Sequence, residues 1–223
     1  MVRVVAFADT HQFHDELQVP DGDVLLCVGD VCRGGEREEL EIFLAWFSAF
    51  PHKTKLFVAG NHDGCLETEL AEVRAAHPHI RFLQDEGVDV DGVSFWGSPW
   101  TPNYNDWFFM KTRGAALRER WALIPHGLDV LVTHGPPKGM FDDVGRYRPV
   151  GNASDDLGND ERFVGCADLM ARVQIVRPRV HLFGHIHTTK GDVDVDGIRF
   201  INCTTFECEL PCAVVDLSTR LRG

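Results

Sequence analysis

The sequence predicts an α/β fold, and three observations lead to this prediction. Short apolar runs rich in β-branched and aromatic residues, bounded by glycine or aspartate, are typical of buried strands. Stretches with apolar residues at helical spacing lie between several of these runs, so strands and helices alternate. The 223 residues are 44% hydrophobic and 25% charged, an ordinary globular composition. We therefore expect a single domain spanning residues 1–223.

The first third of the chain predicts parallel strands joined by crossover helices. The strands are expected at 2–8, 24–28 and 55–59. A helix is expected over 36–50, where four apolar side chains repeat at positions i, i+3, i+4 and i+7. These side chains are Leu40, Phe43, Leu44 and Phe47. A second helix is expected over 66–76, because its first turn is acidic, as the helix dipole favours.

Shorter strands dominate the rest of the chain. They are expected at 80–83, 87–90, 93–97, 129–133, 180–183, 198–201 and 213–217. Asp91-Gly92 and Asp196-Gly197 are typical of hairpin turns. Helices are expected over 113–123 and 160–176. Residues 135–158 are rich in Gly, Pro, Asp and Asn, and a loop of that length is usually functional or mobile.

Charge and cysteine content exclude several classes of protein. The net charge of −12 argues against binding a nucleic-acid polymer, which requires basic surface, although bound metal ions can reverse the local field. The chain contains no apolar stretch of the length that a membrane helix needs, and the apolar run near the start is too short for a signal peptide. Seven cysteines without a C-x-x-C motif make a disulfide framework improbable, so a reducing cytoplasmic location is expected.

Five of the predicted strands are followed directly by residues that can bind metals. These residues are Asp9 and His11; Asp30; Asn61, His62 and Asp63; His134; and His185 and His187. Open α/β sheets bind ligands at the carboxyl ends of their strands, where these side chains would project. Taken singly, each His is more simply a hydrogen-bonded core or surface residue, and each Gly-Asp or Gly-Asn pair a turn. Their occurrence in one order, each after a buried strand, favours a metal site for manganese, iron or zinc.

In this order, the motifs Asp9-x-His11, Gly29-Asp30, Gly60-Asn61-His62-Asp63, His134 and Gly184-His185-x-His187 resemble those of the calcineurin-like metallophosphoesterase superfamily. Three further segments resemble the small subgroup of vertebrate metallophosphoesterase-domain proteins, the 239FB-like phosphodiesterases. These segments are 96–100, 133–137 and 183–187. The resemblance implies a four-layer α/β/β/α sandwich of two mixed sheets flanked by helices.

The resemblance also implies a site for two divalent metal ions. Asp9, His11 and His187 would hold the first, and Asn61, His134 and His185 the second, with Asp30 bridging both. Two such ions can clamp a phosphoryl oxygen and lower the pKa of a bridging water, whose hydroxide attacks phosphorus in line. Manganese is the first candidate, with iron or zinc as alternatives.

His62 matches the family histidine that is not a metal ligand. It would protonate the leaving oxygen or stabilise its charge, with the adjacent Asp63 orienting its ring; the alternative is a purely structural role. Arg33 could contact the substrate phosphate, because its planar fork matches phosphate oxygens, or lie on the loop surface. His14 is expected at a solvated surface position.

Substrate identity is less well determined by the sequence. The aromatic residues Trp100, Tyr104, Trp107, Phe108 and Phe109 could stack on a nucleobase or aryl group, or pack within the core or loop. The acidic segment 141–162 does not align with the subgroup.

We expect a phosphoesterase acting on a small phosphodiester or phosphomonoester, such as a cyclic nucleotide. We expect no nucleic-acid polymer or membrane as partner, and the oligomeric state stays open. The alternatives are an enzyme similar to protein serine/threonine phosphatases, or a non-catalytic scaffold of the same fold.

Overall fold

The computed structural model describes residues 1–145 and 162–219. Its first half runs β1 (Val2–Phe7), the 3-10 helix η1 (His14–Glu16), β2 (Val24–Cys27), α1 (Arg37–Ser48), β3 (Thr54–Phe57), α2 (Cys65–Ala76) and β4 (Ile80–Phe82). The second half runs β5 (Glu86–Val90), β6 (Val93–Ser98), β7 (Thr101–Pro102), β8 (Met110–Lys111), α3 (Ala115–Ala122), β9 (Val130–Thr133), α4 (Ala167–Val176), β10 (Val180–Phe183), β11 (Gly191–Val195), β12 (Ile198–Asn202) and β13 (Ala213–Leu217).

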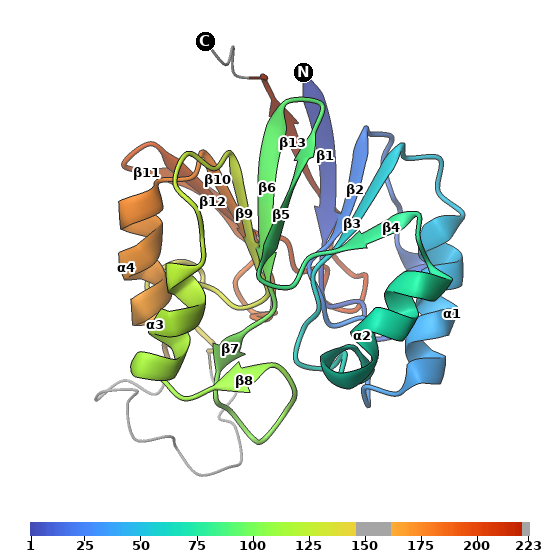
Figure 1. The fold of residues 1–223 in the computed structure, drawn as a ribbon, viewed down its shortest axis with the longest axis horizontal. Helices are drawn as coiled ribbons and strands as arrows, with labels where there is room; N and C mark the ends of the chain where they lie inside the picture. The colour runs from blue at the N-terminus through green and yellow to red at the C-terminus, as the bar shows by residue number, and fades with distance from the viewer. Residues whose placement is uncertain (146–161, 220–223) are drawn as a thin grey trace.

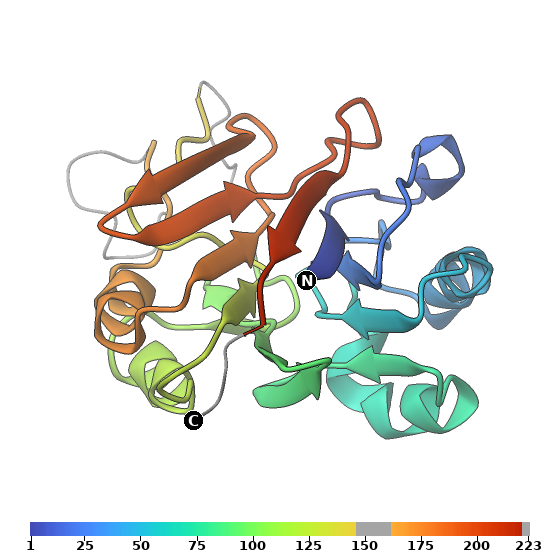
Figure 2. The ribbon, with the colours of Figure 1, turned by 90° about the horizontal axis from the view of Figure 1, so that it is seen from above.

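Two mixed sheets face each other in the middle of the molecule (Figure 1). The five-stranded sheet has the order β13-β1-β2-β3-β4, in which β1 to β4 are parallel and β13 pairs antiparallel with β1. The six-stranded sheet has the order β11-β12-β10-β9-β6-β5, parallel in the centre and antiparallel at both edges. Helices α1 and α2 cover the outer face of the first sheet, and α3 and α4 that of the second, as the view from above shows (Figure 2). The predicted four-layer α/β/β/α sandwich is confirmed.

Alternation along the strands explains this layering. In β1, Val4 and Ala6 are buried in the core between the two sheets, whereas Val5 and Phe7 belong to the core beneath the helices. Phe7 packs against Phe43 of α1, with ring centroids 6.2 Å apart. Because both faces of each central strand are covered, the strands are continuous apolar runs, the pattern from which they were predicted.

The chain's local signals set several element boundaries. Glu36 caps α1, and Glu39 reaches back to the amides that precede the helix, completing a capping box. Asp91 and Gly92 both have positive φ, as a tight turn between β5 and β6 requires. Within the described residues, no helix is both long and apolar enough to cross a membrane.

Two sequence predictions outside the candidate site are wrong. The expected helix over 160–176 begins only at Ala167, because Phe163 and Cys166 form β-bridges with the loop after β9 and Gly165 is in close contact with that loop. His14 is buried rather than solvated, since its ring lies 5.3 Å from Phe43, and this burial lowers its pKa. Strands β7 and β8, two residues each, and β11 were not predicted. Residues 146–158 of the long predicted loop lie outside the described residues.

Candidate metal centre

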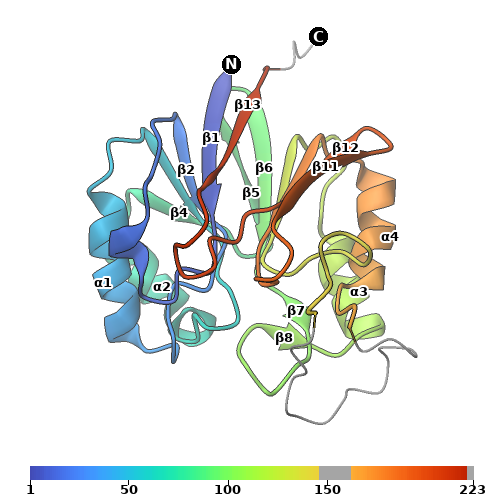
Figure 3. The same cartoon turned by 180° about the vertical axis from the view of Figure 1, so that it is seen from behind.

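The candidate metal ligands lie where five parallel strands end. β1, β2 and β3 of one sheet and β9 and β10 of the other carry them at their carboxyl ends, which lie at the lower end of the two sheets, above β7 and β8 (Figure 3). Four of these residues have left-handed backbone conformations, which are strained for residues other than glycine and typical of functional sites. They are Asp9 (φ 61°), His11 (φ 41°), Asp30 (φ 58°) and His185 (φ 69°).

The predicted ligands form overlapping groups of donor atoms. Asp9, His11 and His187 form one group, and Asp30, His134 and His185 another, with the donor atoms of each group within 4.8 Å of one another. A third group links them, consisting of His11, Asp30 and His62. The remaining predicted ligand, Asn61, has its Oδ1 3.0 Å from Nε2 of His134. Asp30 therefore lies between the two predicted sets of ligands.

Backbone carbonyls fix the orientation of two ligand rings. Nδ1 of His11 lies 3.2 Å from the carbonyl of Cys32, and Nδ1 of His134 lies 2.8 Å from that of Val28. A carbonyl only accepts hydrogen bonds, so both Nδ1 atoms carry the proton and both Nε2 atoms face the cluster. Such contacts commonly orient metal-binding histidines.

The donor set fits divalent cations. Nε2 of His11 is 3.4 Å from Nε2 of His187, and Nε2 of His134 is 3.2 Å from Oδ2 of Asp30. Imidazole nitrogens and carboxylate oxygens that converge in this way repel one another unless a proton or a cation lies between them. Mixed nitrogen and oxygen donors suit manganese, iron or zinc.

The electrostatics keep the buried carboxylates of Asp9 and Asp30 ionised. Burial acts to raise the pKa of Asp9, but the hydrogen bond and charge of His187 outweigh it and lower the pKa to about 2. Burial opposes ionisation of Asp30 too, and His134 nevertheless holds the pKa of that carboxyl well below its usual range. In turn, Asp30 overcomes burial at His134 and raises the pKa of that imidazole to about 9. Burial and the nearby His134 lower the pKa of His185 to about 3.

Asp63 has a different role from the predicted one. Its carboxylate is fully buried and accepts hydrogen bonds from the backbone amides of Asp30 (2.9 Å), Val31 (2.9 Å), Cys32 (3.1 Å) and Gly60 (2.8 Å). It therefore ties the loop after β2 to the loop after β3. The prediction that Asp63 orients the His62 ring is wrong, because its oxygens are used by these amides.

His62 is held by Arg33 instead. Nδ1 of His62 donates a hydrogen bond to the Arg33 carbonyl at 2.7 Å, and the His62 amide donates to Oδ1 of Asp30 at 2.8 Å. The His62 ring lies 4.7 Å from that of His11, and Nε2 is left for a ligand. Arg33 is exposed; its Nε donates to the His11 carbonyl at 3.0 Å, and its guanidinium lies over the ring of Phe13. Both residues thus lie at the rim of the cluster.

Two aromatic rings next to the cluster complete the site. The Trp107 ring lies 4.0 Å from that of His62, and the Phe206 ring 5.7 Å from that of His187. Trp107 was among the aromatic residues proposed from the sequence, but Phe206 was not. No local signal marks Phe206, because its position depends on tertiary contacts.

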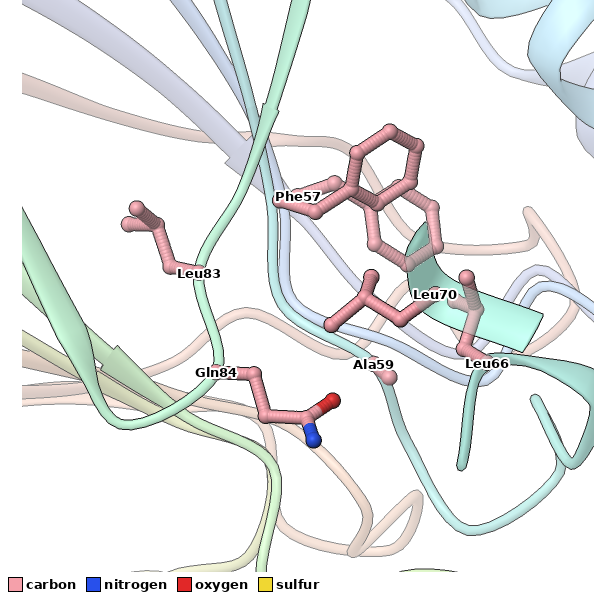
Figure 4. Close-up of a pocket in the computed structure, with 7 residues that line it drawn as sticks. Phe57, Ala59, Leu66, Leu70, Leu83 and Gln84 are labelled. Atoms are coloured by element: carbon pink, nitrogen blue, oxygen red, sulfur yellow. The ribbon is translucent and has the colours of Figure 1, made fainter. Parts of the chain in front are cut away.

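A separate pocket lies between β3, β4 and α2 (Figure 4). It is lined by Phe57, Ala59, Leu66, Leu70, Phe82, Leu83 and Gln84. The lining contains one polar side chain and no titratable group, so it offers no acid, base or metal donor. This pocket therefore lacks the acid, base and metal-binding groups that the cluster of histidines and aspartates offers.

A family model agrees with this geometry. The model described as calcineurin-like phosphoesterase matches residues 2–189. The chain belongs to the calcineurin-like phosphoesterase family. The match extends from β1 to the segment just beyond His187, so it includes every predicted metal ligand.

Similar proteins place this phosphoesterase in the small metallophosphoesterase-domain subgroup. Human metallophosphoesterase domain-containing protein 1 is 34% identical over 245 residues, covering 97% of this chain and 71% of that protein. The UPF0046 protein K07C11.7 of Caenorhabditis elegans is 37% identical over 217 residues, covering 90% of this chain and 69% of that protein.

Solved structures share the fold at lower sequence identity. TT1561 of Thermus thermophilus has a TM-score of 0.60 at 12% identity, covering 97% of this chain and 99% of that one. The phosphopantetheinyl hydrolase of Mycobacterium tuberculosis has a TM-score of 0.57 at 16% identity, covering 90% of this chain and 88% of that one.

Proposed function

We propose that this phosphoesterase hydrolyses a small phosphodiester or phosphomonoester, such as a cyclic nucleotide, with the aid of two divalent metal ions. The observation that carries the proposal is the pair of donor groups on either side of Asp30. One shared carboxylate between two groups of mostly neutral donors is the arrangement that two neighbouring cations need.

The residues assigned to each ion follow from these groups. Asp9, His11 and His187 would hold the first ion, and Asn61, His134 and His185 the second, with Asp30 shared. Bound ions would supply positive charge to a phosphoryl oxygen and lower the pKa of a water. Manganese is our first choice of metal, and iron and zinc have the same donor preferences.

His62 is the candidate for stabilising the leaving group. Its Nδ1 proton is committed to the Arg33 carbonyl, so a proton on Nε2 is the one available to a departing oxygen. The contact with Asp30 through its backbone amide fixes His62 next to the bridging carboxylate. His62 thus has a defined ring orientation, with Nε2 free to carry the second proton of the imidazolium, and a defined place beside the proposed metal ions.

Arg33 is the candidate for binding the phosphate. Its Nε donates to the His11 carbonyl, which anchors the guanidinium at the rim of the cluster. The Nη groups of a planar guanidinium can donate to two phosphate oxygens at once. Asp63 acts by positioning, since it holds the backbone of Asp30 in place.

A small substrate and a cytoplasmic setting agree with the composition. The net charge of −12 disfavours a nucleic-acid polymer. All seven cysteines are free, and six of them are buried, as expected for a protein that folds in a reducing compartment.

Hydrolysis of two nitrophenyl esters tests the proposal. Chelator-stripped protein is assayed with 4-nitrophenyl phosphate and bis(4-nitrophenyl) phosphate before and after Mn²⁺ is added, alongside the Asp30→Asn variant. We expect Mn²⁺-dependent turnover that Asp30→Asn lacks, and the ratio of the two rates assigns the ester class. Turnover of neither ester with Mn²⁺, Fe²⁺ or Zn²⁺ would contradict the proposed function.

A further inference from the structure

A row of five aromatic rings crosses the candidate metal centre. From one end to the other they are Trp107, His62, His11, His187 and Phe206, with neighbouring ring centroids 4.0, 4.7, 5.2 and 5.7 Å apart. The three central rings belong to the proposed catalytic centre. The two end rings offer no metal donor and instead form an apolar wall at each end of the row.

The Phe206 wall is held in place by a constrained loop. Residues 206–208 have φ values of 47°, 54° and 71°, three left-handed conformations in succession, which is a costly arrangement that only surrounding contacts can maintain. The amide of Glu207 donates to the carbonyl of Asp9 at 2.9 Å, and Lys190 donates to two carbonyls of the same loop. The Phe206 side chain, 41% exposed, is thus fixed by the segment that carries Asp9.

The Trp107 wall is held by its neighbour. The Phe108 ring lies directly on Gly64 and Gly35, so that a Cβ atom at these positions would come within 2.4 and 3.0 Å of the ring. The Phe108 amide donates to the Asn61 carbonyl at 3.3 Å. The loop between β7 and β8 is therefore docked on the two loops that carry Asp30 and His62, and Trp107 is half-buried against His62.

These walls have the shape and chemistry of a subsite for flat groups. An ester whose phosphate lies over the central rings must extend its substituents along the row or into solvent. Flat π-systems such as nucleobases or aryl groups stack on aromatic side chains, and a diester has two substituents for two walls. The Trp107 ring packs against His62 at an angle of 33°, so its wall lies on the side where we place the leaving group.

We infer that Trp107 contacts the leaving group of the substrate and Phe206 the retained substituent, which makes the preferred substrate a phosphodiester with aromatic groups on both sides. This inference rests on the proposed function and, within it, favours open-chain diesters with two flat substituents over cyclic nucleotides, which carry a single base.

Three esters with the same leaving group separate the two walls. They are 4-nitrophenyl phosphate, methyl 4-nitrophenyl phosphate and bis(4-nitrophenyl) phosphate, in which the retained substituent is absent, a methyl group or a second aryl ring; the two diesters carry the same charge and give the direct comparison. We expect Phe206→Leu to lower kcat/KM about tenfold for the bis-aryl diester alone. Trp107→Leu should lower kcat/KM for all three. Ile175→Ala, a truncation of an exposed apolar side chain on α4, is the control and should change none of them.

A second variant moves Trp107 without altering its side chain. Gly64 has φ −55° and ψ −38°, so alanine fits its backbone conformation, and the added Cβ collides only with the Phe108 ring among its nearest neighbours. Gly64→Ala should therefore displace the loop and reproduce the Trp107→Leu pattern. Mn²⁺ affinity measured by calorimetry should stay within about twofold of the wild type, because none of the three atoms nearest the added Cβ belongs to a proposed ligand.

Binding of stable analogues distinguishes failure of this inference from failure of the proposed function. Phenylphosphonate and methylphosphonate are titrated calorimetrically into Mn²⁺-loaded protein. We expect the wild type to bind phenylphosphonate about tenfold more tightly than methylphosphonate. In the Trp107→Leu/Phe206→Leu double variant, the two ligands should bind with equal affinity. Equal affinities in the wild type, or an equal effect of Phe206→Leu on all three esters, would overturn the inference even if the enzyme hydrolyses them. Absence of turnover alone would instead overturn the proposed function.

Discussion

Asp63 shows how a single buried carboxylate can organise a site without taking part in its chemistry. Four backbone amides from two loops converge on its oxygens. Asn at this position would direct an NH₂ group toward amide donors and leave at least one of them unpaired. We expect Asp63→Asn to lower the free energy of unfolding by about 3 kcal/mol in urea denaturation, and to weaken Mn²⁺ binding because Asp30 lies on the displaced loop.

A matched surface substitution controls this experiment. Asp216 is an exposed carboxylate paired with Arg3 at 3.1 Å. Asp216→Asn should change the free energy of unfolding by less than about 0.5 kcal/mol, since exposed ion pairs contribute little. If Asp63→Asn unfolds at the same urea concentration as Asp216→Asn, the structural role assigned to Asp63 is incorrect.

His181 is a buried histidine that should make stability depend on pH. The Thr133 hydroxyl donates to the Gly135 carbonyl at 2.7 Å, so Nε2 of His181 donates to that hydroxyl at 2.8 Å. Burial lowers the pKa of His181 to about 3, whereas in the unfolded chain it lies near the ordinary value of 6.5. The neutral ring therefore contributes its full stability above about pH 6.5, and this contribution is lost progressively as the pH falls toward 3.

His181→Gln isolates this contribution, because Gln keeps a donor for Thr133 and does not titrate. Between pH 7 and pH 5, the wild type should lose about 2 kcal/mol more of its free energy of unfolding than the variant does. Urea denaturation in chelator at both pH values measures the difference. Equal losses in the two proteins would show that His181 is not a source of the acid sensitivity.

Among the structural elements, the loops after β2 and β3 are packed against each other with no room for a side chain. A Cβ atom on Gly60 would lie 2.3 Å from Oδ1 of Asp30 and 2.6 Å from Cε1 of His134. Gly60→Ala should therefore lower Mn²⁺ affinity by at least about tenfold, an effect comparable to changing a residue that orients a metal ligand. Calorimetric titration with Mn²⁺ measures it.

Gly34→Ala is the control for Gly60→Ala. Gly34 lies on the loop after β2, and its φ is not positive. A Cβ atom added there would have Glu39 as its nearest neighbour, at an unstrained 3.7 Å. The Mn²⁺ affinity of Gly34→Ala should match that of the wild type. Equal losses at Gly34 and Gly60 would mean that chain stiffness rather than the contact with Asp30 determines the effect.

The elements differ in how far the sequence predicts them. The buried strands could be predicted because both of their faces are covered, which makes them continuous apolar runs. The ligands could be placed at one edge of the sheets because each follows directly after a predicted strand. The start of α4 was not predicted, since Cys166 pairs with a loop distant in sequence. β7 and β8, with two residues each, are too short to show the alternation of apolar and polar residues that marks a strand. The contacts of Asp63, His14 and Phe206 arise only when separate segments meet, so no local pattern indicates them.

At the scale of the whole molecule, the candidate metal centre spans the two sheets. Asp9, His11, Asp30 and Asn61 follow strands of the five-stranded sheet, whereas His134, His185 and His187 follow strands of the six-stranded sheet. Metal ions bound here would join the two halves of the sandwich. They would also neutralise the carboxylates of Asp9 and Asp30, which repel each other when no cation is present.

Metal binding should therefore stabilise the whole fold. Mn²⁺ at about one hundred times its Kd would add about 2.7 kcal/mol to the free energy of unfolding, and for a chain of this size that raises Tm by about 5–10 °C. Thermal melts with Mn²⁺ and with excess chelator measure the shift, and Asp30→Asn, which lacks the shared ligand, should show little of it. Because the ligands come from both sheets, Mn²⁺ should move the circular-dichroism and tryptophan-fluorescence transitions together. A shift confined to one signal, or an unchanged Tm, would mean that the metal does not link the two sheets.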